Sequence, residues 1–232
     1  MNIVVISEGR TELGKTYLNR DFLCPVPTKE LGALETITVR IAKEVFNQNL
    51  TIMGFGMLPH TGPGHVRTAS LGQVIQDPEL LKRILSPCFN PPRRELTANA
   101  IQGAIIACDE TLHNTVSKSI TQVRKSINNK VIHVTFKPEF EIVLLEREAI
   151  EQAANLKPNC IKIPDKNDIE VCGGLKEALV QCVIKSGYHD NPKAASSEFK
   201  LKVARCLSTA YLACDNSPIS ELRQHIFELF TK

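Results

Sequence analysis

Residues 3–12, Ile-Val-Val-Ile-Ser-Glu-Gly-Arg-Thr-Glu, carry the strongest signal for the fold of this chain. The four β-branched residues at positions 3–6 predict a strand that is covered on both faces, as the central strands of α/β sheets are. Gly9 permits a tight turn directly after this strand. Because the carboxyl ends of strands in an open parallel sheet face the ligand-binding crevice, Glu8 and Glu12 are expected at a reactive site. The alternative is that both acids are solvated and stabilise the start of the next helix through its dipole.

Two later apolar segments also end in acidic residues. Residues 103–110 read Gly-Ala-Ile-Ile-Ala-Cys-Asp-Glu, and residues 131–141 join an apolar run to Lys-Pro-Glu-Phe-Glu. Between them, residues 111–127 have apolar side chains at helical spacing. The order strand, helix, strand, helix, strand predicts a parallel sheet with right-handed crossovers, and therefore an α/β fold.

The remaining segments are expected to be mainly helical. Residues 34–46 and 77–85 have helical patterns, and residues 50–57 fit a short strand. The prolines and glycines of residues 59–65 predict a loop, and Pro87 is expected to begin another. Further helical patterns cover residues 148–156, 175–185, 198–213 and 217–230.

The length of 232 residues suits an α/β domain, residues 1–147, with a helical C-terminal region, residues 148–232, packed on its sheet. No apolar run approaches the roughly 18 residues of a membrane span. The first strand also lacks the basic flank of a signal peptide, so we expect a cytoplasmic protein without a membrane partner. The net charge of +3 neither indicates nor excludes a nucleic-acid partner, because local patches matter more than the sum.

The cysteines and histidines do not predict a zinc site. The eight cysteines include no Cys-x-x-Cys pair, so we expect reduced and mostly buried thiols. The six histidines lack metal-ligand spacing, although His60 and His65 share one segment.

The acids at the ends of the three predicted strands should converge at one edge of the sheet. They are Glu8 with Glu12, Asp109 with Glu110, and Glu139 with Glu141. Crowded carboxylates raise each other's pKa unless a cation is bound. Hard oxygen ligands select Mg²⁺ or Mn²⁺, and two such ions can activate water and stabilise a leaving oxygen. The expected chemistry is phosphoryl transfer or phosphodiester cleavage.

The segment Glu-Gly-Arg-Thr-Glu at residues 8–12 resembles the Glu-Gly-x-Thr-Glu signature of Toprim domains, especially those of the overcoming-lysogenization-defect nucleases. Asp109 falls where the first Asp of the family's Asp-x-Asp motif is expected. Pro-Glu-Phe-Glu at residues 138–141 is similar to an element of Toprim-like proteins that are often encoded beside an ATPase. The resemblance covers about residues 1–150 and implies a Toprim-like parallel sheet flanked by helices.

The chain departs from the family pattern at two points. The second Asp of the motif is replaced by Thr111, so Glu110 or Glu141 must complete the site or the site is weakened. The long spacing between Glu12 and Asp109 implies an insertion within about residues 50–98. None of the three tyrosines, Tyr17, Tyr188 and Tyr211, is placed for a topoisomerase intermediate, so we expect hydrolysis.

The resemblance implies a metal-dependent phosphodiesterase or nuclease that acts in phage defence. It would act with a separate ATPase, because this chain has no P-loop motif. Glu8, Asp109 and Glu141 are expected to form one metal site. Glu12, Glu110 and Glu139 would be second-site or outer ligands, and Arg10 and Lys137 would hold the scissile phosphate. The basic residues expected to bind nucleic acid are Arg67, Lys82, Arg83, Arg93 and Arg94, unless they form an ordinary solvated surface.

Two other interpretations stay open. The chain could be a Toprim-like regulatory or binding subunit whose degenerate acids no longer support catalysis, or an unrelated α/β enzyme of phosphate metabolism. The sequence does not distinguish DNA, RNA and nucleotide substrates, and it leaves a homo-oligomer open.

Overall fold

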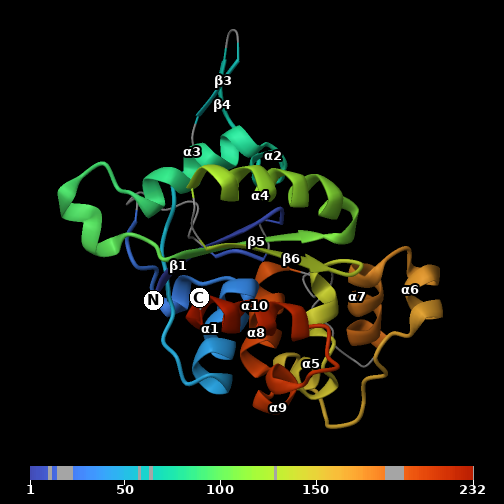
Figure 1. Ribbon diagram of the computed structural model, residues 1–232. Coiled ribbons are helices and arrows are strands. Elements are labelled where there is room, and N and C mark those ends of the chain that lie inside the picture. Colours follow the sequence, from blue (N-terminus) through green and yellow to red (C-terminus); the bar gives the residue numbers. More distant parts are fainter. Residues whose placement is uncertain are drawn as a thin grey trace.

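The computed structural model describes residues 1–9, 12–14, 23–56, 59–62, 65–127, 130–185 and 196–231. These residues contain a four-stranded parallel sheet with the strand order β2-β1-β5-β6 (Figure 1). The strands are β1 (Asn2–Ser7), β2 (Thr51–Ile52), β5 (Gly103–Asp109) and β6 (Val131–Phe136). The predicted α/β fold with a parallel sheet is therefore confirmed.

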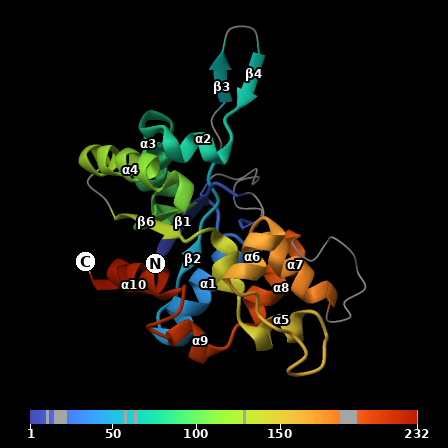
Figure 2. The same ribbon diagram turned by 90° about the vertical axis from the view of Figure 1, so that its right-hand side faces the viewer.

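The sheet lies between two layers of helices (Figures 1 and 2). One face is covered by α2 (Leu71–Gln76), α3 (Pro78–Phe89) and α4 (His113–Ile127). The other is covered by α1 (Ala33–Arg40), α8 (Ser197–Cys206) and α10 (Ser220–Thr231). Cover on both faces explains the uninterrupted apolar run of β1, whose residues 3–6 are fully buried.

Most of the helices that follow β6 share one hydrophobic core with the sheet. The Lys130 ammonium donates a hydrogen bond to the Leu229 carbonyl at 2.8 Å, and the Thr135 backbone N–H donates to Glu221 at 3.3 Å, so α10 lies against the edge strand β6. The other helices of this region are α5 (Arg147–Ala153), α6 (Lys166–Cys172), α7 (Leu175–Lys185) and α9 (Thr209–Ala213).

One expected loop is wrong, and another begins later than expected. Residues 59–65 were expected to be a loop, but β3 (Pro59–Gly62) and β4 (His65–Thr68) form an antiparallel hairpin. Pro59 and Gly62 lie at the two ends of β3, where such residues do not prevent a strand. Helix α3 also continues through Pro87 to Phe89, because Cys88 and Phe89 extend its buried face and outweigh the lost backbone hydrogen bond.

The other predictions about local structure were confirmed only in part. A helix was expected over residues 34–46, and α1 with the π-helix Ile41–Val45 occupies that range. Residues 12–22 are predicted from the sequence to form a short helix or turn, and most of this segment, residues 15–22, lies outside the described residues. The cysteines whose side chains are described are all free thiols, but only Cys88 and Cys108 are buried, so the expectation of mostly buried thiols is wrong. No helix in the described part of the chain is long and apolar enough to span a membrane.

Candidate active site

The ends of β1 and β5 bring Glu8 and Asp109 together. Ser7 pairs with Ala107 in the parallel register, so the residues that follow them leave the sheet at the same edge. The Asp109 backbone N–H donates a hydrogen bond to Glu8 Oε1 at 3.3 Å. Both residues are half-buried. This juxtaposition follows from the register of neighbouring parallel strands, as the sequence led us to expect.

Glu12 is buried and folds back onto the end of β1. The Ser7 hydroxyl donates a hydrogen bond to Glu12 Oε2. Gly9 makes this possible, because a Cβ at position 9 would lie only 2.7 Å from the Glu12 Cδ and would overlap the carboxyl group. The turn after β1 therefore requires glycine for the position of Glu12.

The backbone of Glu12 is held by the start of α1. The Glu12 carbonyl accepts a hydrogen bond from the Leu34 N–H at 3.0 Å. The N–H groups of Gly14 and Gly32 both donate to the fully buried Glu35 carboxylate, at 3.0 and 2.7 Å. The Gly-x-x-Glu spacing of Gly32 and Glu35 is a helix-start signal that could have identified this acid from the sequence.

Glu141 pairs with a lysine that the sequence analysis did not identify. It lies in the 3₁₀ helix Phe140–Leu144 and forms an ion pair with Lys200 of α8. The two side chains are 5% and 2% exposed. The Lys200 ammonium also lies 5.9 Å from the centre of the Phe140 ring. The available signal was a lysine among the apolar positions of α8, but such residues usually extend to the surface.

The cluster formed by Glu8, Glu12, Asp109 and Glu141, hereafter the acid cluster, is electrostatically crowded. Burial raises the pKa of Glu12 to about 7. The hydrogen bond from Ser7 and the positive charge of Lys200 lower this pKa, whereas the negative charges of Glu141 and Glu8 raise it further. Burial also raises the pKa of Asp109 to about 8, together with its hydrogen bond to Glu8 and the charges of Glu12 and Glu8. The Phe140 N–H, 2.8 Å from Asp109 Oδ1, acts in the opposite direction. Part of the cluster is therefore protonated near neutral pH.

The other acids predicted for the site have different surroundings. Glu110 is exposed, and its backbone N–H donates to the Pro138 carbonyl at 3.1 Å. Glu139 accepts a hydrogen bond from the Lys176 N–H at 3.1 Å and so binds the first turn of α7. Lys137 is exposed at the end of β6. Arg10 lies outside the described residues.

The predicted basic residues belong to three separate segments of the chain. Arg67 belongs to β4, and nothing is described of its side chain. On α3, Lys82 is half-buried and Arg83 is exposed. Arg93 and Arg94 are exposed and lie in the segment between α3 and β5.

The donor chemistry of the acid cluster suits a hard divalent cation, because its side chains offer carboxyl oxygens. The present side-chain arrangement, however, is hydrogen-bonded: Glu12 faces Ser7 and Glu141 faces Lys200. Within the described ranges, no group of three or more His, Cys, Asp or Glu side chains is arranged to hold a metal ion. A metal would therefore require side-chain rotation at this edge.

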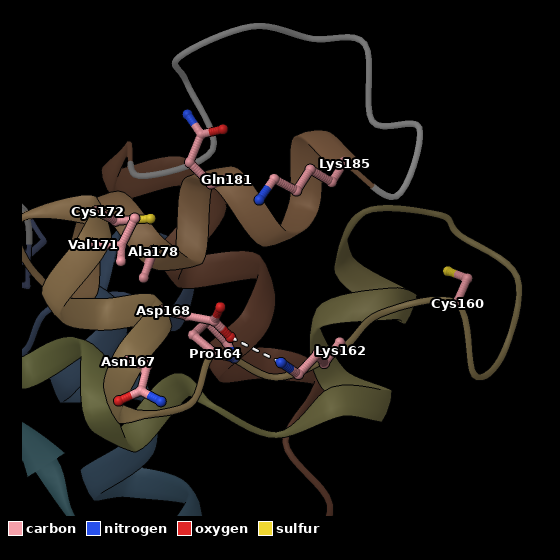
Figure 3. Close-up of a pocket in the computed structure, with 10 residues that line it drawn as sticks. All are labelled: Cys160, Lys162, Pro164, Asn167, Asp168, Val171, Cys172, Ala178, Gln181 and Lys185. Carbon is pink, nitrogen blue, oxygen red and sulfur yellow. Dashed lines mark hydrogen bonds and ion pairs between the residues drawn. The ribbon is translucent and has the colours of Figure 1, made fainter.

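A separate pocket of about 350 Å³ lies between α6, α7 and the segment before α6 (Figure 3). It is lined by residues such as Asn167, Val171 and Gln181, and contains none of the acid cluster. Comparison with protein-family models, curated proteins and solved structures found no match to this chain.

Proposed function

We propose that the acid cluster is the active site of a divalent-metal-dependent phosphodiesterase, in which Glu8, Glu12 and Asp109 would hold Mg²⁺ or Mn²⁺. The observation that carries the proposal is that the ends of β1 and β5 bring these carboxyl groups together, with the Asp109 N–H 3.3 Å from Glu8 Oε1 and Glu12 buried beside them. Burial, with smaller contributions from the neighbouring acids, raises the pKa of Glu12 to about 7 and that of Asp109 to about 8. Carboxyl groups in this state bind a cation at the expense of their protons. A bound ion supplies charge to phosphate oxygens and lowers the pKa of a bound water.

The surrounding residues keep the carboxyl groups in place. Ser7 orients Glu12, the Phe140 N–H orients Asp109, and Lys200 anchors Glu141. Lys137, exposed beyond the end of β6, is available to a phosphate group from the solvent side. We also propose that Arg10 binds the phosphate group together with Lys137. A separate ATPase would regulate the phosphodiesterase, and the system would act in phage defence.

A second candidate is a binding or regulatory subunit without catalysis, and one observation favours it. Lys200 already supplies a buried positive charge within the acid cluster, and no three-ligand group is present among the described residues. In that case Lys200 replaces a metal ion as the internal cation, and the cluster serves stability alone.

Metal binding and cleavage distinguish the two candidates. Mn²⁺ binding should be measured by titration calorimetry, and cleavage of DNA, RNA and a nitrophenyl phosphodiester with Mg²⁺ or Mn²⁺, with and without an ATPase encoded beside this chain. Glu8→Gln and Asp109→Asn should each abolish cleavage and weaken Mn²⁺ binding. Glu79→Gln, on the exposed first turn of α3, is the matched control and should behave as the unmodified protein. A chain that binds no Mn²⁺ and cleaves none of these substrates supports the regulatory role instead.

A further inference from the structure

His113 is an exposed imidazole near the carboxyl edge of the sheet. It is the first residue of α4, which follows the end of β5 after one short turn of helix. Its Nδ1 lies 2.8 Å from the hydroxyl oxygen of Thr135, a buried residue of β6. Its ring also stacks on that of His133, with the ring centres 5.2 Å apart and 19° between the planes. These contacts orient a side chain that is otherwise open to solvent.

A chain of hydrogen bonds occupies Nδ1 of His113. Beyond the Thr135 hydroxyl, the chain continues to Nε2 of His133 at 3.3 Å, and that nitrogen lies 3.3 Å from the Cys108 sulfur. Burial, followed by nearby positive charges, lowers the pKa of His133 to about 4, so His133 is neutral near pH 7. In either direction of the chain, Nδ1 is the engaged nitrogen of His113. Among the described residues, Nε2 of His113 has no hydrogen-bond partner, so Nε2 is the nitrogen that can exchange a proton with a ligand.

His113 and Glu8 lie on the same face of the sheet. Glu8 lies against α2, since a Cβ at position 72 would be 4.0 Å from the Glu8 Cβ. Helices α2 and α4 cover one face (Figures 1 and 2). Cys108 lies between the two residues: its Cα pairs with that of Thr135, and burial, followed by the charge of Glu8, raises its pKa to about 12.

The interval between the two residues suits one phosphate group. The strand order is β1-β5-β6, and neighbouring strands are about 4.8 Å apart. Two such spacings put the backbone of Glu8 about 10 Å from that of Thr135, which holds His113. A phosphate bound at Glu8 and Asp109 therefore has an imidazole on its β6 side.

We propose that His113 is the general acid of the phosphodiesterase, and that its Nε2 donates a proton to the leaving oxygen of the substrate. This inference rests on the proposed function and adds a residue to its mechanism. In an in-line displacement, the attacking and leaving oxygens lie on opposite sides of the phosphorus. With the attacking water at the acid cluster, the leaving oxygen is on the side of His113. Thr135 is a positioning residue, because it holds Nδ1 and leaves Nε2 free.

The step balances with water as the only co-reactant. The water oxygen gives an electron pair to phosphorus and releases one proton to solvent. The bond between phosphorus and the leaving oxygen breaks, and its electron pair takes the proton from Nε2 of His113. One phosphodiester and one water thus give a phosphomonoester and an alcohol, and His113 regains a proton from solvent.

The first test compares two leaving groups, with Mg²⁺ or Mn²⁺ present. The substrates are bis(4-nitrophenyl) phosphate and the dinucleotide TpT, in which one phosphodiester joins two thymidines. His113→Ala should lower kcat/KM for TpT by roughly 10²–10⁴-fold, the usual contribution of a general acid. It should leave the nitrophenyl substrate nearly unchanged, because nitrophenolate spreads its charge over the ring and leaves without a proton. Asn114→Ala, the exposed next residue of α4, is the matched control and should cleave both substrates as the unmodified protein does.

Two further measurements separate proton donation from a structural role. Imidazole added to His113→Ala should restore part of the TpT activity, since the substitution leaves open space at the surface. The second measurement needs no turnover. Thymidine 5′-phosphate, a monoester product, should shift the Cε1–H NMR signal of His113 when it is added with Mg²⁺. The signal of His225, on α10 at the other face of the sheet, should not move.

The general acid and the phosphodiesterase fail in different ways. If the unmodified chain cleaves both substrates and His113→Ala slows both equally or neither, the phosphodiesterase stands and the role of His113 is wrong. The same conclusion follows if thymidine 5′-phosphate leaves the His113 signal in place. An unmodified chain that cleaves neither substrate with either metal overturns the phosphodiesterase, and the general acid with it. Circular dichroism establishes that each variant is folded.

Discussion

Replacing Lys200 by Met should destabilise the protein strongly. The Lys200 and Glu141 side chains are 2% and 5% exposed, so the substitution leaves the Glu141 carboxylate buried without its cation. Removing one partner of a buried ion pair costs about 3–5 kcal/mol. For a chain of this length, each kcal/mol lowers Tm by about 2–4 °C, so the expected decrease is about 6–20 °C.

Replacing the other member of the ion pair, Glu141→Gln, should lower the free energy of unfolding by less. Lys200 lowers the pKa of Glu12 and Glu141 raises it, so Glu12 can serve as the counter-ion when Glu141 becomes neutral. Loss of Lys200, in contrast, leaves both Glu12 and Glu141 buried without the Lys200 cation. The double variant Lys200→Met/Glu141→Gln should recover part of the loss, since no uncompensated charge remains at position 141.

Urea unfolding at pH 7, followed by circular dichroism, measures these differences. Lys202→Met is the control on the same helix: its ion pair with Glu198 spans 3.4 Å, and the side chains are 51% and 78% exposed. Such a pair contributes about 0–1 kcal/mol. The reasoning is refuted if Lys200→Met costs no more than Lys202→Met, or if the losses from Lys200→Met and Glu141→Gln simply add in the double variant.

Three further predictions concern other residues of the site and the thiols. The pKa of Asp109 is raised to about 8 against an ordinary 3.8, so the folded state keeps a proton that the unfolded chain releases. The contribution of Asp109 to stability is therefore fully present below about pH 4 and is lost as the pH rises to about 8. Thermal unfolding in EDTA should show Asp109→Asn becoming more stable relative to the unmodified protein from pH 5 to 8, and a constant difference contradicts this. Gly9→Ala should displace the Glu12 carboxyl with little change in Tm. Gly32→Ala should lower the free energy of unfolding by about 1–3 kcal/mol, because its Cβ would lie 2.5 Å from the Glu12 backbone oxygen. Equal Tm values for the two variants would show that the backbone around Gly32 is not tightly packed. Thiol labelling followed by mass spectrometry should modify the exposed Cys160 and Cys214 first. Cys108 should react late, because burial raises its pKa to about 12. Early labelling of Cys108 would mean that β5 opens readily.

Local sequence patterns were sufficient for the elements at the centre of the fold. Strands β1 and β5 contain uninterrupted apolar runs because both of their faces are buried, and β6 is apolar except at His133 and Thr135. The start of α3 was equally predictable, since Asp77 accepts hydrogen bonds from the Glu79 and Leu80 N–H groups at 2.9 and 3.2 Å. The approach of Glu8 to Asp109 followed from the same patterns, because parallel strands in register end at the same edge.

Contacts between distant segments decided the rest of the acid cluster. Nothing in the local pattern of α8 indicates that Lys200 reaches Glu141 instead of solvent, because its direction depends on how α8 packs against the 3₁₀ helix Phe140–Leu144. Glu139, three residues after β6, appeared equivalent to Glu141, yet it binds the start of α7. Local sequence specifies which backbone conformations bury apolar groups, whereas the partner of a buried charge is determined by whichever segment the tertiary fold places beside it.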